Sequence, residues 1–250
     1  MSIVSISCLG SFGRFGNQLF QYAFAKAYAD RHGSILQTPA WVGQKLFEHI
    51  NDPPITKQLP KTSVDNVPWG KVDIDLFGYF QFKECFDYYS LTWLRQLFQF
   101  GHRWLLMFPK EGQYVAAHRR SGDYLTKHQR VYCTVKEESF IRAYREFNLD
   151  NQRLIWVSEE RPNTDDRLTT DVSFLKDFMI LMNADVLLRS NSTFSWWAGT
   201  LGSGAVYSPI VGDHLGLSDV PFVKGNYPRF LHPHYCRGTS APPCDLHIRE

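Results

Sequence analysis

Two arginines follow a short apolar run near the middle of the chain. Residues 115–117 are typical of the end of a buried strand, and they lead into Arg119, Arg120 and, after a small flexible pair, Asp123. A strand that opens into arginine and glycine at its carboxyl end is where an open α/β sheet binds anionic ligands. The planar guanidinium suits phosphate because it offers paired donors and keeps its charge. The alternative is a surface turn with two solvated arginines, and this stretch alone does not separate the two.

A second polar stretch follows a later apolar strand, at residues 190–195. It packs five hydroxyl or amide side chains into a predicted strand-to-helix junction. Such side chains, with the exposed amides of a helix start, form an uncharged cradle for phosphate or ribose. Trp196 and Trp197 come next and are interpreted as core anchors of a short helix. The five side chains of the stretch are Ser190, Asn191, Ser192, Thr193 and Ser195.

A glycine-containing turn lies between the first predicted strand and the first predicted helix, at residues 13–18. Gly13 and Gly16 allow close approach to a ligand, and the helix start adds partial positive charge. It is not a dinucleotide fingerprint, because the third glycine and a downstream ribose-binding acid are absent at the usual spacing. The alternative is a tight turn with Asn17 as the helix N-cap.

Asp177 is a lone acid in the apolar run at residues 174–182. A partly buried carboxylate needs a partner. One candidate is the edge of a guanine base, which presents two adjacent N–H donors. The alternative is a salt bridge to Lys176 or Arg189.

Hydrophobic spacing predicts two successive α/β sets that position these residues. A border is expected at residues 108–112, residues 51–70 are interpreted as a surface connection, and residues 225–250 as a tail. Gly33 is expected to end the first helix, and Thr134 with Glu137 has capping-box spacing. The predicted strands are 3–9, 34–38, 73–80, 113–118, 153–158, 185–189 and 205–209. The first predicted helix starts after residue 16, and a short last helix follows the 190–197 stretch and ends near residue 202. The helices between them are predicted at 84–107, 136–147 and 174–183.

Composition narrows the function classes. The chain has 250 residues, with 27 basic and 25 acidic side chains, which disfavours a nucleic-acid partner. It has no apolar run of the ~18 residues that a membrane span needs, and no basic signal start, so a cytoplasmic chain is expected. The five cysteines are scattered without a CxxC pair, which argues against a zinc site. Cys236 and Cys244 could pair, although free thiols are favoured.

Four stretches, taken in order, are similar to the α-1,2-fucosyltransferases of glycosyltransferase family 11. The family's GR-x-GNQ-x-FQYA start is matched at residues 13–23, and its GYFQ element at residues 78–81. Its H-x-R-R-G-D-Y motif corresponds to residues 118–124, and N-S-S-F-S-W-W to residues 191–197. Four ordered matches are much more specific than any one of them.

The resemblance implies an α/β fold of GT-B type, in which two Rossmann-like domains face each other across a cleft. Residues 1–108 would form the acceptor-side domain, and residues 109–250 the GDP-fucose-binding domain with its tail. The reaction implied is an inverting, metal-independent transfer of L-fucose from GDP-fucose to the 2-hydroxyl of a galactose-containing glycan. GDP-fucose and a galactose-terminated acceptor are therefore the expected partners, with no cofactor.

The resemblance also assigns roles. Arg120 would neutralise the leaving GDP, Asp177 would accept from guanine N1 and N2, and Arg14 with Asn17 would reach the cleft from the N-terminal domain. Asp123 would be the base or an orienting acid, with His128 as the alternative base. The implied donor-binding set is Arg14, Gly16, Asn17, His118, Arg120, Asp177, Asn191, Ser192, Thr193, Phe194 and Ser195.

The chain departs from the family pattern at one place. The second motif arginine falls at Ser121, while Arg119 occupies the usually apolar position before Arg120. Because side chains alternate along a strand, Arg119 is expected to point away from Arg120 unless a bulge brings it round. Without that bulge the protein lacks one anion contact.

Two other functions compete. Protein O-fucosylation or α-1,6 transfer would share the arginine motif, although the FQYA start, residues 78–81 and the Trp pair favour the α-1,2 group. The second alternative, favoured by Ser121 alone, is an inactive nucleotide- or carbohydrate-binding relative.

Overall fold

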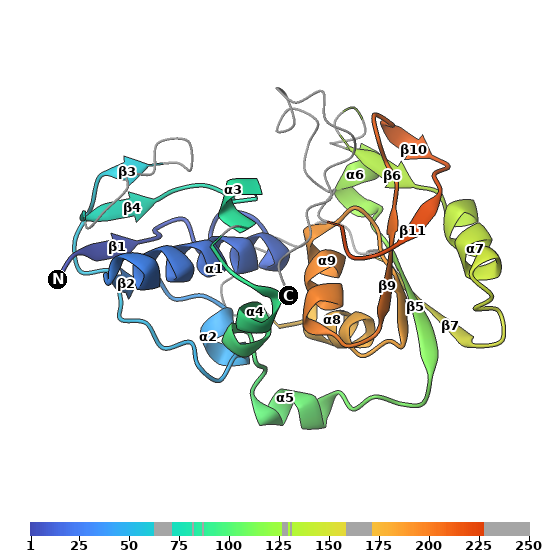
Figure 1. Cartoon of the computed structure of the whole chain (residues 1–250), viewed down its shortest axis with the longest axis horizontal. Helices are drawn as coiled ribbons and strands as arrows, with labels where there is room; N and C mark the ends of the chain where they lie inside the picture. The colour runs from blue at the N-terminus through green and yellow to red at the C-terminus, as the bar shows by residue number, and fades with distance from the viewer. Residues whose placement is uncertain are drawn as a thin grey trace. The chain divides into compact units, whose positions relative to one another are not determined.

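The computed structural model describes residues 1–62, 72–81, 83–86, 88–126, 130, 132–158 and 172–227. These residues belong to two compact units (Figure 1). Unit 1 holds the described residues of Met1–Met107, and unit 2 holds those from Phe108 to 158 and from Ser173 to 227.

Unit 1 is built on a parallel sheet in the order β2-β1-β4-β3. Its strands are β1 (Ile3–Ser5), β2 (Ile35–Gln37), β3 (Lys61–Thr62) and β4 (Ile74–Leu76). Helix α1 (Phe15–His32) connects β1 to the neighbouring β2, which is the predicted βαβ start. Strand β3 lies within the predicted surface connection, so that interpretation was wrong at this point.

Helix α1 is buried over most of its surface and begins and ends where its sequence requires. Leu19, Phe20 and Ala23 are fully buried. Gly33 ends the helix as predicted, with a left-handed φ of 58°. The Gly33 N–H donates to the Asp30 carbonyl. Glycine adopts this left-handed backbone conformation without steric cost.

The remaining helices of unit 1 are short. The aromatic stretch predicted as one helix over 84–107 forms three: α3 (Lys83–Phe86), α4 (Leu91–Leu97) and α5 (His102–Met107). Helix α2 (Gly43–Leu46) was not predicted. Ser90 begins α4, because its side chain accepts a hydrogen bond from the Trp93 N–H at 3.2 Å.

Unit 2 is built on a five-stranded sheet in the order β11-β9-β8-β5-β7. The four parallel strands were predicted, because each is an apolar run between turns. The antiparallel edge strand β11 was not. The strands are β5 (Tyr114–Arg119), β7 (Arg153–Ser158), β8 (Val186–Leu188), β9 (Ala205–Pro209) and β11 (Phe222–Lys224).

Helices cover both faces of this sheet (Figure 1). Helix α7 (Glu137–Glu146) lies on one face, with Phe140 packed on the buried side chains of Val115 and Ala117. Helices α8 (Leu175–Met182) and α9 (Thr193–Leu201) lie on the other. Three further elements lie beside the main sheet: α6 (Gly122–Thr126), β6 (Cys133–Val135) and its parallel partner β10 (Gly216–Ser218).

The predicted capping box of α7 was wrong. Thr134 is fully buried within β6, and the N-cap residue is Lys136, which makes no side-chain capping bond. Glu137 and Glu138 occupy the first turn instead, where negative charge complements the helix dipole.

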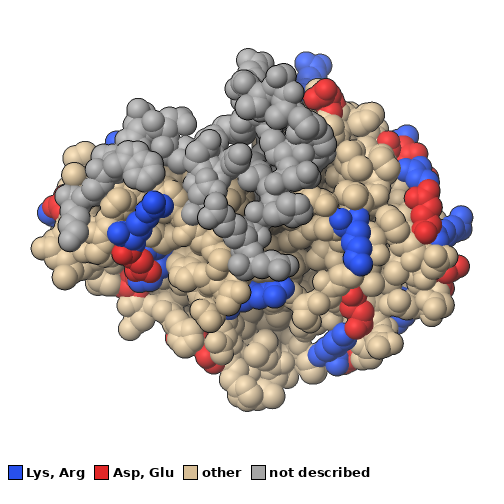
Figure 2. Space-filling view, viewed as in Figure 1, with Lys and Arg blue, Asp and Glu red and all other residues tan. Residues whose placement is uncertain are grey.

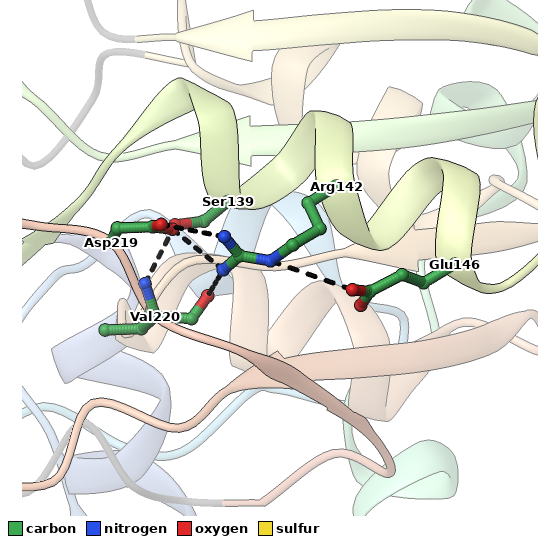
Figure 3. Close-up of polar contacts among 5 residues, drawn as sticks. All are labelled: Ser139, Arg142, Glu146, Asp219 and Val220. Carbon is green, nitrogen blue, oxygen red and sulfur yellow. Dashed lines mark hydrogen bonds and ion pairs between the residues drawn. The ribbon is translucent and has the colours of Figure 1, made fainter.

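An ion-pair network ties α7 to the segment between β10 and β11 (Figure 3). The Arg142 guanidinium donates to both carboxylate oxygens of Asp219, at 2.7 and 2.8 Å. The Ser139 hydroxyl donates to Asp219 at 2.6 Å and accepts from the Val220 N–H at 2.9 Å. Hydrogen bonds from Arg142, and then from Ser139, lower the pKa of the Asp219 carboxyl to about 2.

The Asp219→Asn substitution should therefore lower stability at neutral pH, and the deficit should shrink on acidification. The folded pKa lies below the unfolded value of about 4, so the Asp219 contribution is present above about pH 4 and is lost towards pH 2. Urea unfolding of both proteins across this range measures the effect. Asp213→Asn, at an exposed aspartate on the preceding connection between β9 and β10, is the control. An unchanged pH slope in Asp219→Asn would contradict the assignment.

Candidate functional site

The connections of the unit 2 sheet run to opposite sides of the junction between β5 and β8. The chain leaves β5 for β7 on one side, and it leaves β8 for β9 on the other. In open α/β sheets, ligands bind outside the carboxyl ends of the strands at such a switch point. The arginine stretch follows β5 and the hydroxyl-rich stretch follows β8, so the structure brings the two predicted stretches to the same edge.

His118 joins these two stretches. The pairing of Ala117 with Leu188 brings the end of β5 beside Ser190, and Ser190 Oγ lies 2.9 Å from His118 Nδ1. The imidazole is 5% exposed, and its ring centroid is 5.7 Å from that of Phe194 at the start of α9. His118 therefore packs within the edge of the sheet and fixes the loop after β8.

His118 is neutral in the folded protein. Burial, and then the charges of Arg120 and Arg189, lower its pKa from 6.5 to about 3. A neutral imidazole can hydrogen-bond a ligand with the nitrogen that Ser190 leaves available, but it does not supply positive charge.

The stretch at residues 190–195 has an inner and an outer part. Asn191 is buried and donates to the Cys133 carbonyl at 2.9 Å. Ser195 is fully buried, with its hydroxyl 3.4 Å from the Ser190 and Ser192 carbonyls. Ser192 is the N-cap of α9 and accepts from the Phe194 N–H at 3.3 Å. These side chains hold the loop, which leaves partly exposed Thr193, at the start of α9, to meet a ligand.

Phe194 connects this loop to the helical face of the sheet. Its ring meets Phe174 and Phe178 edge-on, at centroid distances of 6.2 and 5.2 Å. Trp196 and Trp197 are fully buried, which confirms that they anchor α9 in the core.

Arg189 is a site residue that sequence reasoning missed. It is 1% exposed and donates to Ser208 Oγ and to the Ser190 carbonyl, each at 2.8 Å, and also to the Tyr227 carbonyl. Among the described residues no carboxylate lies within ion-pair distance of it. Burial lowers its pKa to about 9. A buried charge with only neutral acceptors is costly. Because Arg189 donates to the Ser190 carbonyl, its positive charge lies next to the 190–193 loop.

The sequence did carry a signal for Arg189. It follows an apolar strand directly, as Arg120 follows β5, but it was considered only as a partner for Asp177. The predicted partial burial of Asp177 was wrong, because its side chain is exposed on the first turn of α8. Arg189 bonds neutral groups and does not pair with Asp177.

The two motif arginines contact different neighbours. Strand β5 stays in regular register with β7 as far as Arg119, and no bulge turns this residue round. Arg119 Nη1 lies 3.0 Å from a carboxylate oxygen of Glu137 on α7. The Arg120 guanidinium lies 5.1 Å from the ring centroid of Tyr124. Arg119 thus lies on the α7 side of β5 without a bulge, as strand alternation predicts, and Arg120 follows the end of the strand.

Helix α6, which was not predicted, follows these arginines. Ser121 directly precedes it, and the Ser121 carbonyl accepts from the Leu125 N–H at 3.0 Å. Serine is favoured where a helix begins, so Ser121 fits this position. Asp123 lies within α6, with a side chain outside the described part of the structure. His128, Cys236 and Cys244 also lie outside the described residues.

The glycine-containing turn of unit 1 also lies at a carboxyl edge. It follows β1, and residues 78–81 follow the neighbouring β4. The Gln81 side-chain amide donates to Asn17 Oδ1 at 2.9 Å, which joins the two motifs. Arg14 is the N-cap residue of α1, so the alternative that Asn17 caps this helix was wrong. Gly16 is buried in its first turn.

Two aspartates of unit 1 form an Asp-x-Asp pattern at β4, but they are engaged separately. Asp73 pairs with Lys57 Nζ at 2.5 Å. Asp75 is buried and accepts from the hydroxyls of Ser5 and Ser7, at 3.0 and 2.6 Å. In the part of the chain that the structure describes, no group of three His, Cys, Asp or Glu side chains could hold a metal ion.

Charged side chains are dispersed on the face seen in Figure 2, where Lys and Arg of the described residues alternate with Asp and Glu. No helix in the described ranges is long and apolar enough to span a bilayer. An open groove of mixed charge lies along α7, on the side away from His118. It is lined by Arg119, Lys136, Glu137, Glu138, Ile141, Arg142, Arg145, Glu146 and Leu217.

Comparison with known proteins identifies the family. A family model described as glycosyl transferase family 11 matches residues 57–210, which is more than half of the chain. The chain belongs to glycosyl transferase family 11. The matched region of this family 11 chain includes residues 78–81, the arginine stretch and the 190–195 loop. No match was found among curated proteins.

The fold of this family 11 chain is similar to that of solved fucosyltransferases. NodZ α-1,6-fucosyltransferase soaked with GDP-fucose aligns with a TM-score of 0.53 and 13% identity, over 89% of this chain and 99% of that chain. NodZ co-crystallised with GDP gives 0.53 and 14%, over 90% and 99%. Selenomethionine NodZ from Bradyrhizobium gives 0.53 and 11%, over 89% and 98%. At these identities the likeness is one of fold.

The buried imidazole predicts a specific pH dependence of stability. Between about pH 6.5 and pH 3, His118 is protonated in the unfolded chain but not in the folded chain. This residue therefore lowers the free energy of unfolding as the pH falls. The contribution approaches about 1.4 kcal/mol per pH unit well below pH 6.5. In His118→Gln this part of the slope should disappear from urea unfolding at pH 7, 6 and 5. His214→Gln, at an exposed histidine, should keep the native slope, and loss of slope in both variants would refute the assignment.

Proposed function

We propose that this family 11 glycosyltransferase transfers L-fucose from GDP-fucose, with inversion, to the 2-hydroxyl of a galactose-containing glycan. The observation that carries the proposal is the meeting of Arg120, neutral His118 and the start of α9 at the switch point of the unit 2 sheet. The donor is carried over from the family motifs, and crystals of NodZ with GDP-fucose and GDP are consistent with it. A GT-B arrangement, with unit 1 on the acceptor side, is part of the same proposal.

The donor diphosphate would lie at the carboxyl edge of unit 2. Arg120 and the first amides of α9 offer charged and neutral donors, and Thr193 adds a hydroxyl. Arg189 acts from behind the loop through its buried charge. Asp177, on the first turn of α8, is proposed to accept from guanine N1 and N2. Asn191, Ser192 and Ser195 would act by holding the loop.

The reaction explains why such donors are needed. The acceptor oxygen forms a bond to the anomeric carbon as the bond from that carbon to the β-phosphate oxygen breaks, so negative charge develops on GDP. Fixed guanidinium and amide donors stabilise this charge without a metal, and one such donor is worth about 3–4 kcal/mol. The acceptor hydroxyl must also lose a proton. Asp123 is proposed as base or orienting acid, with His128 as the alternative.

Product linkage separates this proposal from its alternatives. GDP-fucose is incubated with galactose-terminated disaccharides, and the linkage of the product is assigned by NMR. A 1,2-linked fucosyl galactoside is expected. An α-1,6 product or a fucosylated protein would replace the proposed linkage, and no GDP release with any acceptor would favour the inactive relative.

Arg120→Ala should lower turnover by roughly 100-fold or more, since it removes a donor to the leaving diphosphate. Arg119→Ala is the matched control, because Arg119 pairs with Glu137 on the other face of the sheet and should keep turnover within a few-fold. Steady-state GDP release with a β-galactoside measures both. Equal losses in the two variants, or near-normal turnover in Arg120→Ala, would remove Arg120 from the mechanism.

Asp123→Asn and His128→Ala test the base. The variant that lacks the base should lose the ionisation on the acidic limb of the pH–rate profile, together with most of its turnover. A profile unchanged by both substitutions would eliminate both residues.

A further inference from the structure

Three aromatic side chains form a column at the carboxyl edge of the unit 1 sheet. The rings of Phe77 and Tyr79 each stack on Phe12, at centroid distances of 5.6 and 4.4 Å and interplanar angles of 26° and 21°. Phe12 follows β1, and the other two follow β4. Lys61 Nζ lies 4.5 Å from the centroid of Phe77 and closes that end of the column. Phe77 is 38% exposed and Tyr79 is 37% exposed, so this is not a core cluster.

The local backbone keeps these rings at the surface. Phe80 has a left-handed φ of 52°, which is uncommon for a residue other than glycine. Its side chain is 1% exposed and stacks on Phe24 at 4.7 Å. The turn therefore buries Phe80 while Phe77 and Tyr79 remain outside. Strained backbone of this kind gathers where ligands bind.

Amide groups lie next to the Tyr79 end of the column. A Cβ at Gly13 would lie 2.7 Å from Asn17 Nδ2 and 3.0 Å from the Tyr79 ring, and the φ of Gly13 is +86°. Only glycine at position 13 therefore allows the Tyr79 ring and the Asn17 amide to lie this close to the backbone. Asn17 in turn accepts from Gln81 at 2.9 Å. An exposed ring beside two planar amides combines an apolar surface with hydrogen-bonding groups.

We propose that the Tyr79 end of this column binds the terminal galactose of the acceptor, an inference that rests on the function proposed above. A galactopyranose has one face made of C–H bonds, which carry partial positive charge, and hydroxyls around its rim. The C–H face complements the negative face of an aromatic ring, and the amide of Gln81 can donate to and accept from the hydroxyls. Sites for small molecules combine these two features, an aromatic surface and a few placed polar groups.

The full chain with Tyr79→Ala tests this inference. With saturating GDP-fucose, the KM for lactose should rise by roughly tenfold, because the stacked surface is lost. The dissociation constant of GDP, measured by calorimetry, should stay close to the native value, because the donor diphosphate is proposed to bind on unit 2 and Tyr79 belongs to unit 1. Tyr79→Phe keeps the ring and should bind lactose nearly as the native chain does. Trp156→Ala, at a ring of matched exposure (36%) in unit 2, should leave the lactose KM unchanged.

Saturation-transfer NMR with lactose gives a readout that needs no turnover. Native protein should transfer saturation to galactose protons, and Tyr79→Ala should lose most of it. Tyr79→Leu keeps apolar bulk in case the alanine variant fails to fold, and should lose it as well. Loss of this signal in a chain that transfers no fucose would support the galactose site and refute the proposed function. The galactose site would be overturned if lactose binding were unchanged in both Tyr79 variants, or if the native chain gave no signal. It would also be overturned if the variants weakened GDP binding and left lactose binding intact.

Discussion

The pairing of β5 with β8 is the constraint on which the candidate site depends. These strands are far apart in sequence, and their parallel register sets Ala117 beside Leu188. Both strands end at the same edge of the sheet, where the His118 imidazole lies within hydrogen-bond distance of the Ser190 hydroxyl. The alanines of β5 are fully buried and leave room for helices on both faces. A shift of one residue in this register would turn His118 towards α7 and separate it from the loop.

Strand alternation then divides the charges of the site between two faces. Odd-numbered residues of β5 face α7, where Arg119 meets Glu137, and His118 faces the side of α8 and α9. The sheet thereby separates Arg119, which pairs with Glu137 on α7, from the His118 imidazole, which contacts the loop after β8. At the edge of unit 1 a turn has a similar effect, since the left-handed backbone of Phe80 accompanies burial of its ring while its neighbour Tyr79 stays exposed.

Much of this arrangement could be predicted from local sequence. The parallel strands are apolar runs between turns, and Gly33 marks the end of α1, because these signals lie within a few residues of each other. The missed elements α2, α6, β3, β6, β10 and β11 are all short, and the missed strands depend on partners elsewhere in the chain. The aromatic stretch after residue 83 contains two helix breaks, one at Ser90, which caps α4, and one before α5, where Gly101 precedes His102. The burial of Arg189, the exposure of Asp177 and the contact between Asn17 and Gln81 depend on tertiary packing that spacing does not encode.

The buried charge of Arg189 affects the free energy of unfolding of the protein. Its guanidinium is held among a hydroxyl and two carbonyls, so the fold carries a buried positive charge that a nearby anion would compensate. Any anion that binds only the folded chain raises its stability through mass action. A charge shielded from solvent is also weakly screened by salt. In the proposed function, compensation of this buried charge by the donor diphosphate would contribute both to the affinity for the donor and to the free energy of unfolding of the complex.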